Sequence, residues 1–384
     1  MGQRFILEPL EKDARDKEYF GLVLSTLLLV GLGLSVLLSS SFYRGAVAFR
    51  DPYYFFRNQL VFVGLGSGVA LFLSFYPGER IQRWVPWMFL SGLLLMGLVF
   101  VPQIGLTLLG GRRWIQIGSF TFQPSEFMKV GMVLHLAHLL SRRQDRLGNF
   151  TDTLFPTVLI VVVLFFLVLG QNDFSSAVLF LGLGFLMIFV AGVSFTYIFA
   201  LIFTGSALAT IFLLSKETRV NRLLAFLDPE QDPIGKGFQV LSSKTALMNG
   251  GLTGLGIGQG VRKLGGLPEA NSDYIFAVLG EEMGFLGVVG VMGLFGIFAW
   301  FGYRTAFRHG RTFIGLSAFG LTSGVLLQAL LNMAVVSGVL PPTGITLPFF
   351  SSGGSSMVMT LITVGLLLSF SRVPNSEERE EHFG

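Results

Sequence analysis

Apolar stretches of about twenty residues recur along the chain, and short polar segments separate them. A hydrocarbon core of about 30 Å needs about 20 apolar residues per helix, so this pattern predicts membrane-spanning helices. Ten ranges qualify: 20–40, 58–76, 85–102, 125–141, 153–170, 174–191, 194–214, 275–302, 312–337 and 353–371. We therefore expect an all-α polytopic membrane protein with about ten transmembrane helices.

The composition strengthens this interpretation. Charged residues make up 13% of the 384 positions, against roughly 25% in an ordinary globular protein. The chain has no cysteine, which excludes a disulfide scaffold, an iron–sulfur cluster, a thiolate zinc site and a cysteine nucleophile. The formal net charge of +4 fits the positive-inside rule better than binding to nucleic acid.

Lysine and arginine in the short loops predict the orientation. With the N-terminus in the cytoplasm, the inner segments hold fourteen of these residues and the short outer loops hold five. We expect a cytoplasmic segment over 1–19, a transmembrane domain over 20–372 and a cytoplasmic tail over 373–384. The first 19 residues carry five acids and four bases, so the first span does not resemble a cleavable signal peptide.

The range 215–274 is predicted to be a large extracytoplasmic loop between spans seven and eight. It contains two Asp-Pro turns and a glycine-rich run from Gly250 to Gly266. Loops of this length are usually functional or disordered. Apolar residues within it, such as Phe226 and Phe238, favour an ordered loop with short helices that lie against the membrane.

Ionisable residues in spans are costly, at about 2.5–3.5 kcal/mol each on insertion scales, and here they gather in three places. The first place runs from Arg112 and Arg113 to Glu126 and Lys129. Glu126 and Lys129 are three residues apart and share a helix face. They form either an ion pair that holds the helix to its neighbours or a polar wall of a cavity that accepts an anionic headgroup.

The other two places lie near the predicted outer surface. Asp173 follows span five, where a lone aspartate is usually a turn residue or a helix N-cap. Asp273 lies at the start of span eight, where Asn271 or Ser272 can cap the helix and leave Asp273 in its first turn. Glu281 and Glu282 follow about 12 Å deeper, and one of them forms a salt bridge to another helix if they are structural.

Motifs at these places resemble those of the SEDS family, the polytopic peptidoglycan polymerases that include FtsW, RodA and a sporulation protein. The similarity runs from about residue 20 to 372. It includes Gly111-Arg112-Arg113-Trp114-Ile115, Gln123-Pro124-Ser125-Glu126, Leu267-Pro268-Glu269-Ala270-Asn271-Ser272-Asp273-Tyr274 and Gly353-Gly354-Ser355-Ser356. The string Leu340-Pro341-Pro342-Thr343-Gly344 is closer to the FtsW division branch than to RodA. Departures include Asn271 and Ser352, where the family usually has His and Tyr.

The resemblance implies that the enzyme polymerises lipid II, the disaccharide-pentapeptide on undecaprenyl diphosphate. Asp273 aligns with the essential aspartate of the family and is our candidate general base, or alternatively a ligand for a divalent cation such as Mg²⁺ or Mn²⁺. The candidate substrate contacts are Arg112, Arg113, Glu126, Lys129, Asp173, Lys263, Glu269 and Ser351. The implied location is the bacterial cytoplasmic membrane, with the active site facing outward. The implied partners are a class B penicillin-binding protein with one transmembrane helix and other membrane proteins of cell division.

Three other functions stay open from the sequence. A RodA-type elongation polymerase would share the chemistry. A lipid II flippase would favour coupling charges at the membrane midplane and an internal repeat. A scaffold that only recruits a transpeptidase predicts that Asp273 is dispensable.

Overall fold

Residues 4–108, 111–118, 120–146, 150–193, 205, 226, 228 and 235–374 are described in the computed structural model. The helices are α1 (Arg4–Phe49), α2 (Tyr54–Phe75), α3 (Gly78–Leu98), α4 (Pro124–Ser141), α5 (Phe155–Gly170), α6 (Phe174–Ala191), α9 (Lys236–Gly250), α10 (Ile275–His309), α11 (Phe313–Val336) and α12 (Gly354–Ser371), with short turns η1 (Gln144–Arg146) and η2 (Phe150–Leu154). Helices overlap nine of the ten predicted ranges. The remaining range, 194–214, lies outside the described residues apart from Gly205.

Among the described residues, seven helices are long and apolar enough to cross a membrane: α1, α2, α5, α6, α10, α11 and α12. Helices α3 and α4 also overlap predicted spans, but α3 begins with Glu79 and Arg80, and α4 carries Glu126 and Lys129. The prediction of a polytopic helical membrane protein is confirmed at this level. The count of ten spans stays a prediction.

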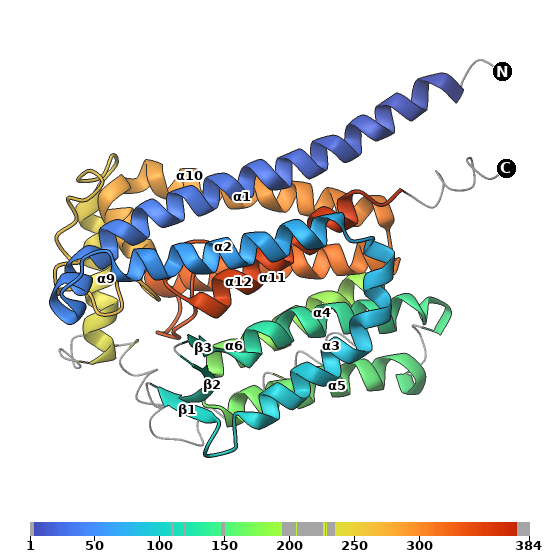
Figure 1. The fold of residues 1–384 in the computed structure, drawn as a ribbon, viewed down its shortest axis with the longest axis horizontal. Coiled ribbons are helices and arrows are strands. Elements are labelled where there is room, and N and C mark those ends of the chain that lie inside the picture. Colours follow the sequence, from blue (N-terminus) through green and yellow to red (C-terminus); the bar gives the residue numbers. More distant parts are fainter. Residues whose placement is uncertain are drawn as a thin grey trace.

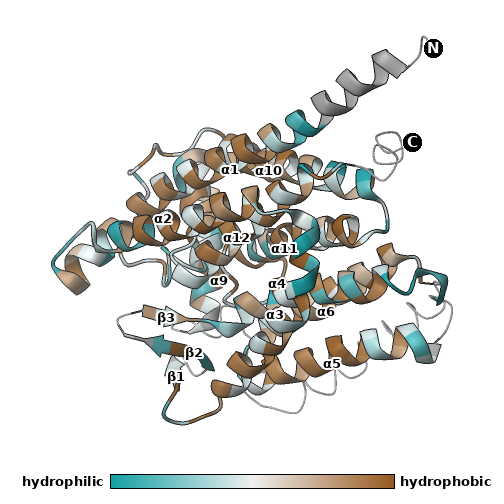
Figure 2. Cartoon of the chain, turned by 45° about the vertical axis from the view of Figure 1, so that its right-hand side comes forward, coloured by the Kyte–Doolittle hydropathy of each residue, from teal (hydrophilic) through white to brown (hydrophobic). Residues whose placement is uncertain are grey.

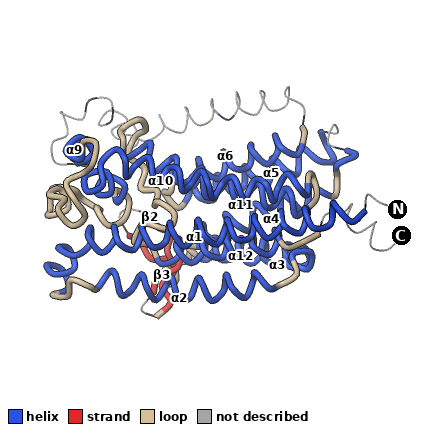
Figure 3. The backbone as a smooth tube through the Cα atoms, turned by 90° about the horizontal axis from the view of Figure 1, so that it is seen from above, coloured by secondary structure: helices blue, strands red, loops and turns tan. Residues whose placement is uncertain are grey.

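The helices form two groups that α11 joins (Figure 1). One group contains α1, α2, α10 and α12, and the other contains α3, α4, α5 and α6. Helix α11 packs against α10 and α12 on one side and against α4 and α6 on the other. Figure 3 shows the same long, roughly aligned helices from above. Hydrophobic residues run along the helices, and hydrophilic residues lie mostly toward their ends (Figure 2).

The two ends of the bundle differ. The start of α1 and the end of α12 lie at one end, whereas α9 and the small sheet lie at the other (Figure 1). The start of α1 and the end of α12 are therefore at the same end of the bundle.

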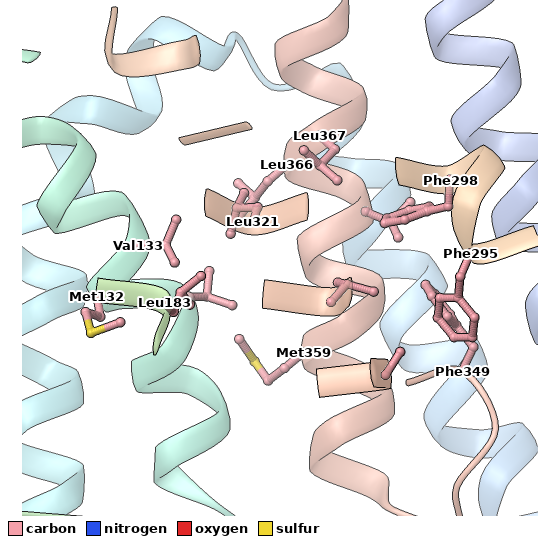
Figure 4. Close-up of a cluster of buried hydrophobic side chains, with 14 of the residues drawn as sticks. Met132, Val133, Leu183, Phe295, Phe298, Leu321, Phe349, Met359, Leu366 and Leu367 are labelled. Atoms are coloured by element: carbon pink, nitrogen blue, oxygen red, sulfur yellow. The ribbon is translucent and has the colours of Figure 1, made fainter. Parts of the chain in front are cut away.

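The core continues from one helix group to the other (Figure 4). Its large buried side chains include Met132, Leu183, Phe298 and Phe349. The rings of Phe298 and Phe349 meet edge to face with centroids 5.8 Å apart. A Cβ at Gly33 of α1 would lie 2.1 Å from the Phe349 carbonyl oxygen, so a glycine is needed for α1 to approach this loop.

A three-stranded antiparallel sheet corrects the all-α prediction. Strands β1 (Gly105–Leu108), β2 (Gly111–Ile117) and β3 (Phe120–Phe122) pair in the order β1-β2-β3. Leu106 lies opposite Trp114, and Gln116 lies opposite Thr121. Within β2 only Ile115, Gln116 and Ile117 alternate between apolar and polar, which is a weak strand pattern. The sheet caps one end of the bundle and directs β2 toward the starts of α4 and α6.

The glycine-rich part of the predicted outer loop fits into a break in α10. The helix is interrupted at Gly284, whose φ of 66° and ψ of −168° are not helical. The carbonyl groups of Glu281 and Glu282 accept hydrogen bonds from loop amides at 3.0 Å, and the amides of Phe285 and Leu286 donate to loop carbonyls at 2.9 and 3.1 Å. The loop thus satisfies the backbone groups that the break exposes. These bonds fix the loop to the helix that follows Asp273.

Candidate active site

A cavity of about 170 Å³ lies at the end of the bundle that carries the sheet. Its walls come from β2, the starts of α4 and α6, the turn before α10, α11 and the loop before α12. Five of the predicted site residues line it: Arg113, Glu126, Asp173, Glu269 and Asp273. Segments more than 150 residues apart in sequence therefore contribute four carboxylates and one guanidinium to a single cavity.

The backbone around Asp273 is held from two sides. Asn332 of α11 donates a hydrogen bond to the Asp273 carbonyl at 2.8 Å, and Ser351 donates to the Ser272 carbonyl at 2.7 Å. The Ser272 hydroxyl donates to Asp273 Oδ1 at 3.1 Å. A Cβ at Gly344 would lie 3.2 Å from Asp273 Oδ2, so the carboxylate faces the loop that contains Gly344. Such backbone support pre-organises a reactive side chain.

The turn that holds Asp273 differs from the predicted capping. Helix α10 begins at Ile275, with Tyr274 at the N-cap and no capping side-chain hydrogen bond, so Asp273 precedes the helix. The prediction that Asn271 or Ser272 caps the helix is wrong. The amides of Ser272 and Tyr274 instead donate to the Glu269 carbonyl at 3.0 and 3.2 Å, and Glu269 has a left-handed φ of 53°. Burial, and secondarily the Asp273 carboxylate, raises the pKa of Tyr274, so its hydroxyl stays protonated.

Glu269 lies at the outer part of the cavity and is paired with Arg44 of α1. The two guanidinium nitrogens donate to the two carboxylate oxygens at 3.1 Å each. Arg44 also donates to the Asn271 side chain at 2.9 Å. This bidentate pair joins α1 to the turn before Asp273.

Asp173 is the N-cap of α6 and also forms an ion pair with Arg113. Its Oδ1 accepts a hydrogen bond from the Ser176 amide at 3.1 Å, so it is the N-cap of α6. Its Oδ2 lies 3.3 Å from Arg113 of β2, and both side chains are mostly buried. Gln123 also donates to Oδ2 at 3.3 Å. The N-cap prediction is confirmed, and the same residue fixes the position of Arg113 in the cavity wall.

Glu126 and Lys129 form the predicted ion pair, and Glu126 also lines the cavity. Lys129 Nζ lies 2.8 Å from Glu126 Oε2, and both side chains are 12% exposed. Lys129 donates a second hydrogen bond to Gln328 Oε1 at 2.5 Å. Gln328 in turn donates to the Thr346 carbonyl and hydroxyl at 3.1 Å. Glu126, Gln328 and Thr346 line the cavity, whereas Lys129 lies beneath it.

Gln328 and Asn332 are functional candidates that the sequence analysis missed. They are buried one turn apart on α11. Asn332 donates to the Asp273 carbonyl and also to the Ile345 carbonyl at 2.7 Å, so it joins two segments that line the cavity. A pair of amides at i and i+4 in an apolar span was the available signal, because polar residues in spans are rarely incidental. Arg44 is one of the five basic residues in the predicted short outer loops, and its pairing with Glu269 was not predicted.

Four predicted substrate contacts, including Lys129, do not line the cavity. Lys263 is buried against Glu282 at 2.5 Å, so that glutamate forms the predicted salt bridge, but its partner lies in the loop before α10 and not in another helix. Arg112 donates to the Phe100 carbonyl at 3.3 Å. Ser351 is buried and supports the Asp273 turn from behind. These residues were adjacent to site motifs in sequence, but their side chains serve the surrounding structure.

The cavity acids do not form a metal cage. Within the described part of the chain, no three His, Cys, Asp or Glu residues are grouped closely enough to hold a metal ion. Glu269, Asp173 and Glu126 are each paired with a basic side chain. A divalent cation bound here would therefore depend mainly on substrate phosphates for its ligands.

Comparison with known proteins agrees with the motifs. A sequence model described as "Cell cycle protein", built for FtsW, RodA and SpoVE, matches residues 20–376. The chain belongs to this family. A relative from Borreliella burgdorferi, named as a probable peptidoglycan glycosyltransferase FtsW, is 39% identical, with 91% of this chain and 95% of the relative covered. Stage V sporulation protein E of Bacillus subtilis is 37% identical, with 91% of this chain and 96% of that protein covered.

A solved structure extends the family assignment to the fold. It describes the structural coordination of polymerization and crosslinking by a peptidoglycan synthase complex. The matching chain is 31% identical, with a TM-score of 0.77 and coverage of 92% of this chain and 97% of that chain. The arrangement of the described helices is thus that of the family.

Proposed function

We propose that this protein is a peptidoglycan glycosyltransferase that polymerises lipid II into glycan strands, with Asp273 as the general base. The observation that carries the proposal is the single cavity in which Asp273 lies with three other acids and Arg113. Relatives that cover most of the chain bear the name "Probable peptidoglycan glycosyltransferase FtsW", which favours the division branch over RodA-type elongation.

The proposed reaction needs one base. The 4-hydroxyl oxygen of one sugar attacks the anomeric carbon of another lipid II molecule, and the bond from that carbon to the diphosphate oxygen breaks. The hydroxyl proton passes to the Asp273 carboxylate, and the bond electrons leave with the diphosphate. Because diphosphate is a good leaving group, charge neutralisation replaces the second carboxylic acid that a glycosidase needs.

We assign the diphosphate contact to Arg113. Its guanidinium lines the cavity, is 18% exposed and is oriented by Asp173. A guanidinium presents parallel donors to phosphate oxygens. Lys263, Arg112 and Ser351 are removed from the substrate contacts because their side chains bond elsewhere. Glu126 and Glu269 are placed as acceptors for sugar hydroxyls, since both line the cavity.

The topology proposal keeps the termini in the cytoplasm and the cavity on the outer side of the bacterial cytoplasmic membrane. The fourteen-to-five distribution of basic residues supports it. The start of α1 and the end of α12 lie at one end and the cavity at the opposite end (Figure 1). Lipid-linked substrate would then enter from the outer leaflet.

The proposed partner is a class B penicillin-binding protein whose single helix packs on α10. The related solved structure is a complex that polymerises and crosslinks. On α10, a Cβ added to Gly290, Gly293 or Gly296 meets nothing within 4 Å, and Val289 and Met292 beside them are exposed. Small residues on an open face allow close helix approach. Cysteines at Gly290 and Gly293 should crosslink to the partner helix, and failure at both positions would contradict this placement.

Purified protein, its transpeptidase partner and labelled lipid II test the function. A polymerase produces glycan chains that a muramidase digests. A flippase moves labelled lipid II across a vesicle membrane without forming chains. A scaffold does neither, and it retains partner binding. Chain formation supports the proposal, and either of the other two results refutes it.

A further inference from the structure

An open pocket of about 480 Å³ lies at the corner between α2 and α3, far from the cavity. This corner is at the end of the bundle that holds the start of α1 and the end of α12 (Figure 1). The pocket is lined by Tyr76, Arg80, Arg83, Trp84 and Trp87. The four α3 residues follow the spacing i, i+3, i+4 and i+7, so they share one helix face. None of the described lining residues is acidic.

The aromatic residues form a fixed wall with a polar edge. Trp84 Nε1 donates a hydrogen bond to the Tyr76 hydroxyl oxygen at 3.1 Å. Because that oxygen accepts from Trp84, the Tyr76 hydroxyl proton is directed elsewhere and can serve a ligand. The Tyr76 carbonyl accepts from Ser369 of α12 at 2.6 Å, which anchors this corner to the bundle. Trp84 and Trp87 are nevertheless 58% and 67% exposed.

Along α3 the exposed side chains change from charged to aromatic to aliphatic, which matches the order of the phosphate, glycerol and acyl-chain regions of a phospholipid. Arg80 and Arg83 are exposed in the first turns of the helix, and the two tryptophans follow. Leu90 and Leu94, 58% and 64% exposed, come next on the outer surface. At 1.5 Å per residue, Arg80 and Leu94 are about 21 Å apart along the axis, close to the depth of one leaflet with its headgroups. The series passes from phosphate-binding groups through interfacial rings to groups that suit acyl chains.

We propose that this pocket binds an anionic phospholipid of the leaflet on the side of the terminal helices. Two guanidinium groups and the Tyr76 hydroxyl bind the phosphodiester, and the tryptophan rings pack on the glycerol region. Tryptophans alone would serve as general interfacial anchors. Two arginines on the same face, with no acid lining the pocket, add the charge complementarity that selects an anionic headgroup.

The test compares headgroups on the purified full-length protein by native mass spectrometry. Dioctanoyl phosphatidylglycerol and dioctanoyl phosphatidylcholine are titrated separately. Soluble glycerol phosphate is then added to the phosphatidylglycerol titration as a competitor. The wild type should bind phosphatidylglycerol at one saturable site and prefer it to phosphatidylcholine. The double variant Arg80→Gln/Arg83→Gln should weaken phosphatidylglycerol binding by about 30-fold. Soluble glycerol phosphate should not compete at the same phosphate concentration.

A matched control separates a site from general surface charge. Arg142→Gln/Arg146→Gln removes the same charge from exposed residues beyond the end of α4 and should leave the phosphatidylglycerol preference unchanged. A second variant, Trp84→Phe, keeps an aromatic ring but removes the donor to Tyr76, and should weaken binding less than the double variant. Equal loss in the control, equal binding of both lipids by the wild type, or full competition by glycerol phosphate would each overturn the proposal. Unchanged melting temperatures of all variants make the comparison valid.

Discussion

Replacing Asn332 with leucine should lower the polymerisation rate far more than an equally destabilising substitution away from the cavity does. The Asn332 amide nitrogen donates to the carbonyl oxygens of Asp273 and Ile345, at 2.8 and 2.7 Å, and the side chain is 1% exposed. Leucine has a similar size but no donor. Two backbone carbonyls, of two segments that line the cavity, would lose their shared partner.

The structure sets the expected magnitude. A buried polar group left without a partner costs about 1–3 kcal/mol, so the two carbonyls together cost about 2–6 kcal/mol if nothing moves. The turn that carries Asp273 can relieve part of this cost by shifting. A displacement of about 1 Å at a reacting group lowers a rate by about 10²-fold. We therefore expect kcat to fall about 100-fold, while KM for lipid II changes little because Arg113 is untouched.

The assay is polymerisation of labelled lipid II by the purified protein with its partner, with rates normalised to folded protein. His309→Leu is the matched control. This buried histidine lies at the far end of α10, and its ring nitrogens lie 2.9 and 3.1 Å from the carbonyl oxygens of Thr305 and Val373. It should lower the melting temperature by a similar amount and leave kcat nearly unchanged. Equal kcat values for the two variants would refute the positioning role of Asn332.

Two further predictions concern charge and backbone. The exchange Glu126→Lys with Lys129→Glu restores the ion pair but places a carboxylate next to the Gln328 side-chain oxygen. Activity should therefore stay below one tenth of wild type in the same assay. Normal activity would show that the pair is only structural. Gly284→Ala places a Cβ 2.3 Å from the Gly254 amide nitrogen at a positive φ, so it should lower the melting temperature and expose the loop to protease, and an unchanged cleavage rate would contradict the proposed loop fixation.

The helices could be predicted from the sequence because lipid imposes a simple requirement on length and polarity. The sheet could not, since its strands are short and glycines interrupt the segment that contains them. The alternation of Ile115, Gln116 and Ile117 is too short to distinguish a strand from a loop.

The site was predictable by residue type but not by contact. Asp273 was predicted from motif resemblance. Its place before α10 depends on the left-handed turn at Glu269, and a glutamate in the sequence does not predict that conformation. Lys263 was assigned to substrate as a basic residue of the predicted outer loop, whereas in the structure this loop packs against α10 near Gly284 and brings Lys263 to Glu282. Gln328 was readable as a polar residue in a span.

The most direct test of the central proposal is polymerisation of lipid II by Asp273→Asn. Asparagine keeps the size of the side chain and leaves the Asn332 and Ser351 bonds to the backbone of this turn in place, but it cannot accept the hydroxyl proton. We predict that no glycan chains form, while membrane insertion and partner binding match wild type. Polymerisation within about tenfold of wild type, a loss of only about 1.4 kcal/mol in transition-state stabilisation, would contradict Asp273 as the general base.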